Sequence, residues 1–146
     1  MDSRTAAHVL STIAAYLELK GENTFKTRAY QSAAKALLAF NADDLAPAHA
    51  SGELAGVRGL GPATLAVVRD LVETGESSYL EQLRESTPEG LLDMLDIPGM
   101  TPAKIHRVHD ELGIDSVEAL ETAARDGRIT TLPKFGPKTA ERILKG

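Results

Sequence analysis

The chain has 146 residues, a formal net charge of −5 and no cysteine. The lack of cysteine excludes a disulfide framework and any cysteine-ligated zinc site, and it is typical of a reducing compartment. Aromatic residues make up only 4% of the chain, which favours closely packed helices over a β-sandwich or barrel. Because no stretch is long and apolar enough for a signal peptide or a membrane span, we expect a cytoplasmic protein without membrane contact.

The charge is unevenly distributed along the chain. Residues 51–96 carry three basic and nine acidic side chains, whereas residues 127–146 carry five basic and one acidic. A negative net charge argues against a broad nucleic-acid-binding surface. Any contact with phosphate must therefore depend on local backbone geometry and on a few well-placed cations.

Two longer helices are predicted at the start of the chain. Apolar residues at spacings of three and four predict a helix over 3–20, with Ser3 or Thr5 as its N-cap and Gly21 at its end. A second helix is expected over 24–40. Its predicted buried stripe consists of Phe25, Ala29, Ala33, Leu37 and Phe40. Pro47 is expected to lie in the break after it.

Shorter helices follow, separated by Gly, Pro, Ser or Thr. They are predicted over residues 51–56, 62–74, 76–86, 88–95, 102–112, 116–126 and 137–145. No alternation with a period of two persists long enough to indicate a strand. The predicted fold is all-α, with two small helical bundles over residues 1–87 and 88–146.

One pattern occurs three times: a hydrophobic residue, a spacer, a tight turn around a central apolar residue, then Pro and a new helix. The copies are residues 57–63 (VRGLGPA), 97–103 (IPGMTPA) and 132–138 (LPKFGPK), which begin 40 and then 35 residues apart. Each copy lies between a short helix and a longer one. The pattern predicts three helix-hairpin-helix-type motifs.

This pattern suits phosphate binding for physical reasons. Glycine in the turn permits positive φ and lets an anion approach the backbone closely. The central apolar residue (Leu60, Met100 or Phe135) is expected to point back and hold the turn against its helices. Proline fits the first helical position, and the free N–H groups of the helix start then face outward. Such a site contacts the DNA backbone and carries no base information.

The three copies differ in residues that matter for binding. The first has both glycines, Gly59 and Gly61, but lies in the acidic stretch, so we expect it to bind through backbone geometry. The second and third are expected to bind through charge. Their candidate DNA-binding residues are Gly99, Thr101 and Lys104 in the second copy and Lys134, Gly136, Lys138 and Arg142 in the third.

Helix 24–40 carries further candidates. Lys26, Arg28 and Lys35 form either a phosphate-binding face or ordinary solvated helix charges. Tyr30 either stacks on a base or packs between the first two helices. His106 and His109 lie three apart, but without an obvious third ligand they are interpreted as surface residues and not as a metal pair.

Several segments together resemble the N-terminal region of bacterial family X DNA polymerases, which are DNA polymerase beta-like. They are residues 18–30 (ELKGENTFKTRAY), 73–75 (ETG), 88–92 (PEGLL) and 132–139 (LPKFGPKT). The resemblance extends over 3–146 and implies a lyase-type domain followed by a helix-hairpin-helix subdomain. Since that family's catalytic palm domain comes later than these segments, we expect no polymerisation by this chain alone.

The resemblance also implies where a lyase lysine would stand. The imine-forming lysine of the family corresponds to Val67 and a second pocket lysine to Ala63, and residues 62–74 contain no lysine. Valine cannot form an imine, so the usual lyase mechanism is not expected. Lys26 and Tyr30 match positions that contact a 5′-phosphate in relatives. A relocated nucleophile, Lys26 or Lys35, would need a depressed pKa.

In relatives, hairpin carbonyls hold a monovalent cation that bridges to DNA. By position, the carbonyls for a Na⁺ or K⁺ ion would be those of Ala55, Val57 and Leu60 and those of Leu95, Ile97 and Met100.

The sequence thus favours a DNA-repair module that binds the phosphate backbone without sequence preference at gaps, nicks, ends or single-strand/double-strand junctions. A polymerase or another repair protein is the expected partner. Two alternatives remain open at this point. One is a 5′-deoxyribose-phosphate or abasic-site lyase with a relocated lysine, and the other is a protein-interaction scaffold derived from a family X polymerase.

Overall fold

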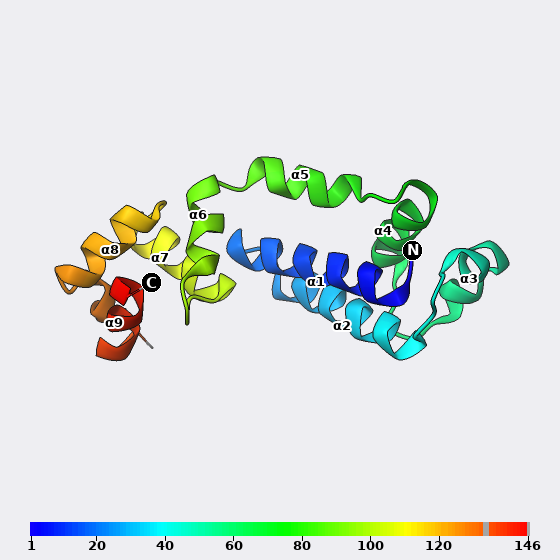
Figure 1. Cartoon of the computed structure of the whole chain (residues 1–146), viewed down its shortest axis with the longest axis horizontal. Coiled ribbons are helices and arrows are strands. Elements are labelled where there is room, and N and C mark those ends of the chain that lie inside the picture. Colours follow the sequence, from blue (N-terminus) through cyan, green and yellow to red (C-terminus); the bar gives the residue numbers. More distant parts are fainter. Residues whose placement is uncertain (133–134, 146) are drawn as a thin grey trace. The chain divides into compact units, whose positions relative to one another are not determined.

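The computed structural model describes residues 1–132 and 135–145, and its regular structure in that part is entirely helical (Figure 1). This confirms the all-α prediction. The longer helices are α1 (Ser3–Leu19), α2 (Thr24–Phe40), α4 (Pro62–Thr74), α5 (Ser78–Ser86), α7 (Pro102–Leu112), α8 (Val117–Arg125) and α9 (Pro137–Lys145). The shorter ones are α3 (Ala46–Ser51), α6 (Glu89–Asp93) and the 3₁₀ turns η1 (Glu53–Gly56), η2 (Met94–Asp96) and η3 (Arg128–Thr131).

The chain divides into two compact units. The first comprises Met1–Glu18 and Glu22–Ser86, and the second comprises Leu19–Gly21 and Thr87–Gly146. Each unit buries its own set of apolar side chains. No helix among the described residues is long and apolar enough to cross a membrane.

In the first unit, α1 and α2 run antiparallel. The Ser3 N–H donates to the Ala42 carbonyl at 2.9 Å at one end of the pair, and the Gln31 side chain donates to Glu18 at 3.1 Å nearer the other end. α4 packs against α2 and α3. The most deeply buried side chains of this unit include Leu10, Ile13, Leu17, Leu37, Leu45 and Val68.

The N-cap prediction for the first helix was wrong. The Asp2 carboxylate accepts the Thr5 N–H at 3.1 Å and so caps α1. Hydrogen bonding from the Thr5 side chain first, and from its backbone N–H second, holds the pKa of Asp2 below its usual value. The Ser3 hydroxyl instead accepts the Ala42 N–H at 2.8 Å. Ser3 therefore joins the two helices and does not cap one of them.

The predicted stripe on α2 was wrong at its N-terminal half. Phe25 is 81% exposed and Ala29 is exposed, whereas the buried residues are Thr27, Tyr30, Ala33, Ala34 and Leu37. A strict spacing of four residues drifts by about 40° per step around a helix that turns about 100° per residue. A stripe with that spacing leaves the core face within three steps.

The segment around Pro47 also differs from the prediction. A helix was expected only over 51–56, but α3 begins at Ala46, with Pro47 in its first turn. Proline is compatible with this position because the first turn of a helix has no internal partner for its N–H groups. η1 then covers Glu53–Gly56, so the expected helix is a short α-helix followed by a 3₁₀ turn.

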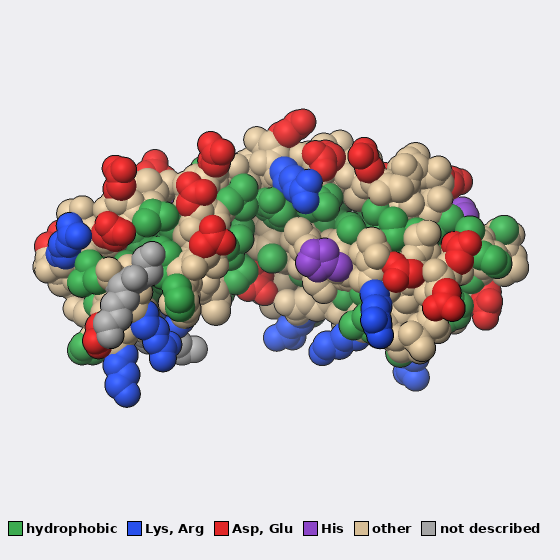
Figure 2. Space-filling view, in the orientation of Figure 1, with side chains coloured by type: hydrophobic (Ala, Val, Ile, Leu, Met, Phe, Trp, Pro, Cys, Tyr) green, Lys and Arg blue, Asp and Glu red, His purple; other side chains and the backbone are tan. Residues whose placement is uncertain are grey.

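The second unit contains two of the three repeats. α8 packs against α9 and α6, and each 3₁₀ turn of this unit contacts the helix that follows it. Its core includes Leu91, Met94, Ile105, Val108, Leu120, Ile129, Phe135 and Ile143. Figure 2 shows that acidic side chains gather over α5, whereas basic side chains project near α9.

Candidate nucleic-acid interface

The three repeats share one hydrogen-bonded frame. Each consists of a 3₁₀ turn, a tight turn and a helix that begins at proline: η1 and α4, η2 and α7, and η3 and α9. The central apolar N–H donates to the carbonyl three residues before it, in the pairs Leu60–Val57 (3.2 Å), Met100–Ile97 (3.1 Å) and Phe135–Leu132 (3.2 Å). All three central side chains are buried. This hydrogen bond is therefore common to all three copies.

The two glycine positions of the motif have different roles. Gly59 and Gly99 adopt φ of +104° and +86°, a region that side chains with a Cβ rarely occupy. Gly61, by contrast, is extended at φ −94° and ψ 179°, and Thr101 is nearly identical at φ −89° and ψ 161°. Thr101 thus replaces the second glycine without backbone strain. Lys134, which stands in place of the first glycine in the third copy, lies outside the described residues.

The residue two positions after the proline distinguishes the first two hairpins. In the first, the Thr64 hydroxyl accepts the Gly61 N–H at 2.8 Å and donates to the Gly61 carbonyl at 3.0 Å. In the second, this position is Lys104, whose Nζ donates to the Gly99 carbonyl at 3.3 Å. Within the described residues the Thr101 N–H has no hydrogen-bond partner. The exposed second hairpin thus keeps an unbonded amide at the position where the first hairpin's amide is already bonded.

Cations of the second unit lie close to these turns. Lys104 Nζ stands 5.8 Å from the centroid of the Phe135 ring, in the third repeat. Arg142, on α9, lies against the second hairpin, because a Cβ added to Gly99 would be 3.4 Å from its Cδ and Nη1 atoms. Lys138 is exposed on the first turn of α9, and Gly136 precedes it.

The three cations of α2 do not form one face. At about 100° per residue, Arg28 and Lys35 lie on the same side of the helix, and Lys26 lies on the opposite side. All three are exposed. Only Lys26 lines the cavity of the first unit, which separates it from the other two.

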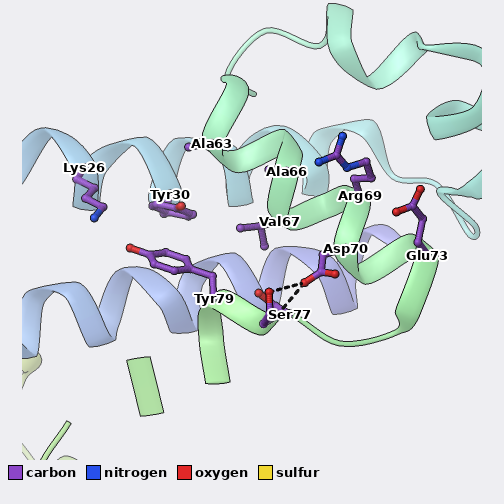
Figure 3. A pocket seen from close by; sticks show the side chains of 11 residues that line it. Lys26, Tyr30, Ala63, Ala66, Val67, Arg69, Asp70, Glu73, Ser77 and Tyr79 are labelled. Atoms are coloured by element: carbon purple, nitrogen blue, oxygen red, sulfur yellow. Dashed lines mark hydrogen bonds between the residues drawn. The ribbon is translucent and has the colours of Figure 1, made fainter. Parts of the chain in front are cut away.

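That cavity has a volume of about 590 Å³ (Figure 3). Its lining comes from α2, α4, α5 and the segment before α5, and consists of Lys26, Tyr30, Ala63, Ala66, Val67, Arg69, Asp70, Glu73, Ser77, Ser78 and Tyr79. The Tyr30 and Tyr79 ring centroids are 5.9 Å apart, so Tyr30 packs against α5. Asp70 Oδ2 accepts bonds from the Ser78 N–H at 2.8 Å and hydroxyl at 3.2 Å.

The electrostatics of the cavity favour a protonated lysine. Lys26 Nζ lies 5.6 Å from the Tyr79 ring centroid, and Tyr79 raises the pKa of Lys26, by hydrogen bonding first and by charge second. The Tyr79 hydroxyl is buried and has no hydrogen-bond partner at bonding distance in the described structure. Burial raises the pKa of Tyr30, which keeps its phenol neutral.

The cavity wall opposite the tyrosines is apolar. Val67 is 5% exposed and lines the cavity with Ala63 and Ala66. The family resemblance places a lysine at the positions of Val67 and Ala63. The carboxylates of Asp70 and Glu73 stand towards the other end from Lys26 (Figure 3). The cavity can therefore hold an anionic group at Lys26 and an uncharged group over the aliphatic wall.

Sequence reasoning did not find Tyr79, Asp70 or Thr64. Tyr79, on α5, meets Tyr30, on α2, through a long-range contact that no local pattern marks. Thr64 follows Pro62 by two residues, and comparison of this position across the repeats would have singled it out. No group of three or more His, Asp or Glu side chains in the described residues is arranged to hold a metal ion.

Helical units built around these turns define a helix-hairpin-helix protein. Residues 1–77 match the family model described as a helix-hairpin-helix domain, and residues 91–146 match a SAM-like helix-hairpin-helix tandem. The chain belongs to the helix-hairpin-helix domain family.

A more particular similarity is to DNA polymerase/3'-5' exonuclease PolX of Bacillus subtilis (strain 168). The two are 36% identical over 145 residues, which is 99% of this chain and 25% of that polymerase. The chain thus spans about a quarter of the length of the relative that it matches. The resemblance to the N-terminal region of family X polymerases is confirmed.

The contrast between the two glycine positions gives a stability prediction. Gly59→Ala should lower the free energy of unfolding by about 1–2 kcal/mol, because a Cβ is strained at this φ and would lie 3.0 Å from the Ala36 Cβ. Gly61→Ala is the control, since its backbone is extended and its Cβ would meet open space. Thermal unfolding followed by circular dichroism measures both. Equal melting temperatures for the two variants would contradict the assignment.

Proposed function

We propose that this chain binds DNA through its phosphate backbone, without sequence preference, at gaps, nicks or ends during DNA repair. The observation that carries the proposal is the second hairpin, where Gly99 and Thr101 form an exposed turn beside the cations Lys104 and Arg142. Such a turn suits a phosphate oxygen because it combines an outward amide with charged donors. It reaches no base edge, so it confers no sequence preference.

The cavity of the first unit suits the end of a DNA strand. The Lys26 ammonium supplies the charge for a terminal 5′-phosphate, and Tyr30 and Tyr79 form the aromatic wall beside it. The methyl groups of Ala63, Ala66 and Val67 can then receive the sugar. We infer that the cavity holds a 5′-phosphorylated end without reacting with it, while a polymerase or another repair enzyme acts on the same gap.

The lyase alternative requires a neutral amine next to the sugar. Val67 has no amine, and the raised pKa of Lys26 keeps its amine protonated at neutral pH. Lys35 lies on the side of α2 opposite Lys26 and does not line the cavity. These observations argue against a Schiff-base reaction. The scaffold alternative requires hairpins that only pack, and measurement of DNA affinity distinguishes it.

Backbone binding should depend on salt and on Lys138. We expect the affinity for duplex and gapped DNA to fall with salt as if about two to four counterions were released. Lys138→Glu should weaken binding equally for unrelated sequences. Arg125→Glu, the same change in charge on α8, is the control and should have a smaller effect. Fluorescence anisotropy over a salt series measures all three proteins. Undetectable affinity at low salt would favour the scaffold alternative.

The strand-end cavity should recognise a 5′-phosphate. Gapped DNA with a 5′-phosphate should bind about tenfold more tightly than gapped DNA with a 5′-hydroxyl, since a charge-assisted hydrogen bond contributes about 1.5–3 kcal/mol. Because the pKa of Lys26 is raised and a 5′-phosphate is almost fully dianionic above about pH 7.5, this preference should not change between about pH 7.5 and 9. Lys26→Gln should abolish the preference, and Lys35→Gln on the same helix should retain it. A preference that persists in Lys26→Gln would contradict the role of the cavity.

Borohydride trapping tests the lyase alternative directly. Wild-type protein incubated with abasic DNA and borohydride should give no covalent adduct. Val67→Lys should give one, since an amine in this apolar wall has a lowered pKa and faces the same cavity. The adduct is measured by its shift on a denaturing gel. An adduct with the wild type that is lost in Lys26→Gln would establish the relocated lysine instead.

A further inference from the structure

Two cations from different repeats converge on one exposed residue of the second hairpin. Lys104, on α7, bonds to the Gly99 carbonyl through its Nζ at 3.3 Å. Arg142, on α9 of the third repeat, also lies against Gly99, 3.4 Å from where a Cβ would stand. Gly99 itself is exposed and has no side chain to cover it. The second and third repeats, which are separate in the sequence, therefore meet at this turn.

The position of Lys104 is held by a second contact. Its ammonium stands 5.8 Å from the centroid of the Phe135 ring, and Phe135 is 3% exposed in the core of the same unit. A cation held over a ring face loses less freedom when it binds an anion. One of its three N–H donors is used by the Gly99 carbonyl, which leaves donors for a ligand. Lys104 is thus oriented before any ligand arrives.

The same ammonium changes what the hairpin carbonyls can bind. The carbonyls of Leu95, Ile97 and Met100 are the candidates for a Na⁺ or K⁺ ion, and Gly99 lies among them in the turn. The Lys104 ammonium, bonded to the Gly99 carbonyl, would repel a second cation bound to the neighbouring carbonyls of the same turn. In the first hairpin the equivalent residue is the uncharged Thr64, which does not repel a cation.

We propose that Gly99, Thr101, Lys104 and Arg142 form one composite site for a single DNA phosphodiester, charged by the protein's own cations and independent of a bound Na⁺ or K⁺. This inference rests on the proposed function, because it assigns the phosphate that the second hairpin contacts. The third repeat then contributes Arg142 to its neighbour's site. The Thr101 N–H, the Lys104 ammonium and the Arg142 guanidinium supply the donors.

The salt dependence of binding tests whether both cations hold the same phosphate. Lys104→Gln and Arg142→Gln should each weaken binding to a short duplex about tenfold. Together they should reduce the slope of log affinity against log salt by about one, because a single phosphate contact is lost. A reduction of about two would mean two separate phosphates and would overturn the composite site. Arg125→Gln on α8 is the matched control and should leave the slope unchanged.

Exchange of the cation tests independence from a metal ion. Affinity is measured in potassium chloride and in tetramethylammonium chloride at equal ionic strength, since the organic cation is too large for a ring of carbonyls. The exchange should change the affinity by the same factor in the wild type and in the double variant Lys104→Gln/Arg142→Gln. A threefold or greater loss that occurs only in the wild type would show that the second hairpin uses a metal ion, and would overturn the proposal.

The possible failures are distinguishable. If the wild type binds no DNA at low salt, the proposed function fails and this inference fails with it. If the wild type binds but Arg142→Gln behaves like Arg125→Gln, the composite site alone is overturned. Melting temperatures of all the variants, measured beforehand, separate a lost contact from a lost fold.

Discussion

The three hairpins depend on one backbone hydrogen bond, which each of them repeats. In each repeat the N–H of a buried apolar residue donates to the carbonyl three residues earlier, which closes the tight turn. Because Leu60, Met100 and Phe135 are buried, the hydrophobic energy of each unit's core also holds its turns in shape. The central residue directs its donor inward, and the amides that follow it, at the start of the next helix, lie at the surface. The contact that stabilises the fold therefore also shapes the turns to which we assign phosphate binding.

Equal backbones do not give equal sites. The first and second hairpins have nearly identical dihedral angles at Gly61 and Thr101. They differ two residues after the proline. In the first hairpin the Thr64 hydroxyl bonds to the Gly61 N–H, whereas in the second the Lys104 ammonium bonds to the Gly99 carbonyl and adds a positive charge. Under the proposed function, this difference explains how a chain with a net charge of −5 can bind phosphate. Few cations suffice when each one is held at an exposed turn.

Local signals in the sequence predicted the helices well, whereas features that depend on long-range contacts were missed. Prolines and capping residues placed α7 at Pro102–Leu112 and α4 at Pro62–Thr74, because these signals act within one turn of the helix. The core face of α2 was misplaced, since it depends on what packs against the helix and not on spacing alone. The cavity was predicted through Lys26 and Tyr30 and, by the family resemblance, through Ala63 and Val67. Tyr79 completes it from α5, and the position of α5 follows from tertiary packing.

The cavity and the second hairpin have a common chemical character, although each belongs to its own unit. In both, a cation lies near an aromatic ring: Lys26 with Tyr79, and Lys104 with Phe135. A raised pKa keeps Lys26 charged, which favours an anion and disfavours attack on a sugar. Val67 likewise disfavours attack on a sugar, because its aliphatic side chain lines the cavity and has no amine to act as a nucleophile. With Val67 offering no amine and Lys26 protonated in the same cavity, the lining agrees with the strand-end role that we propose for it.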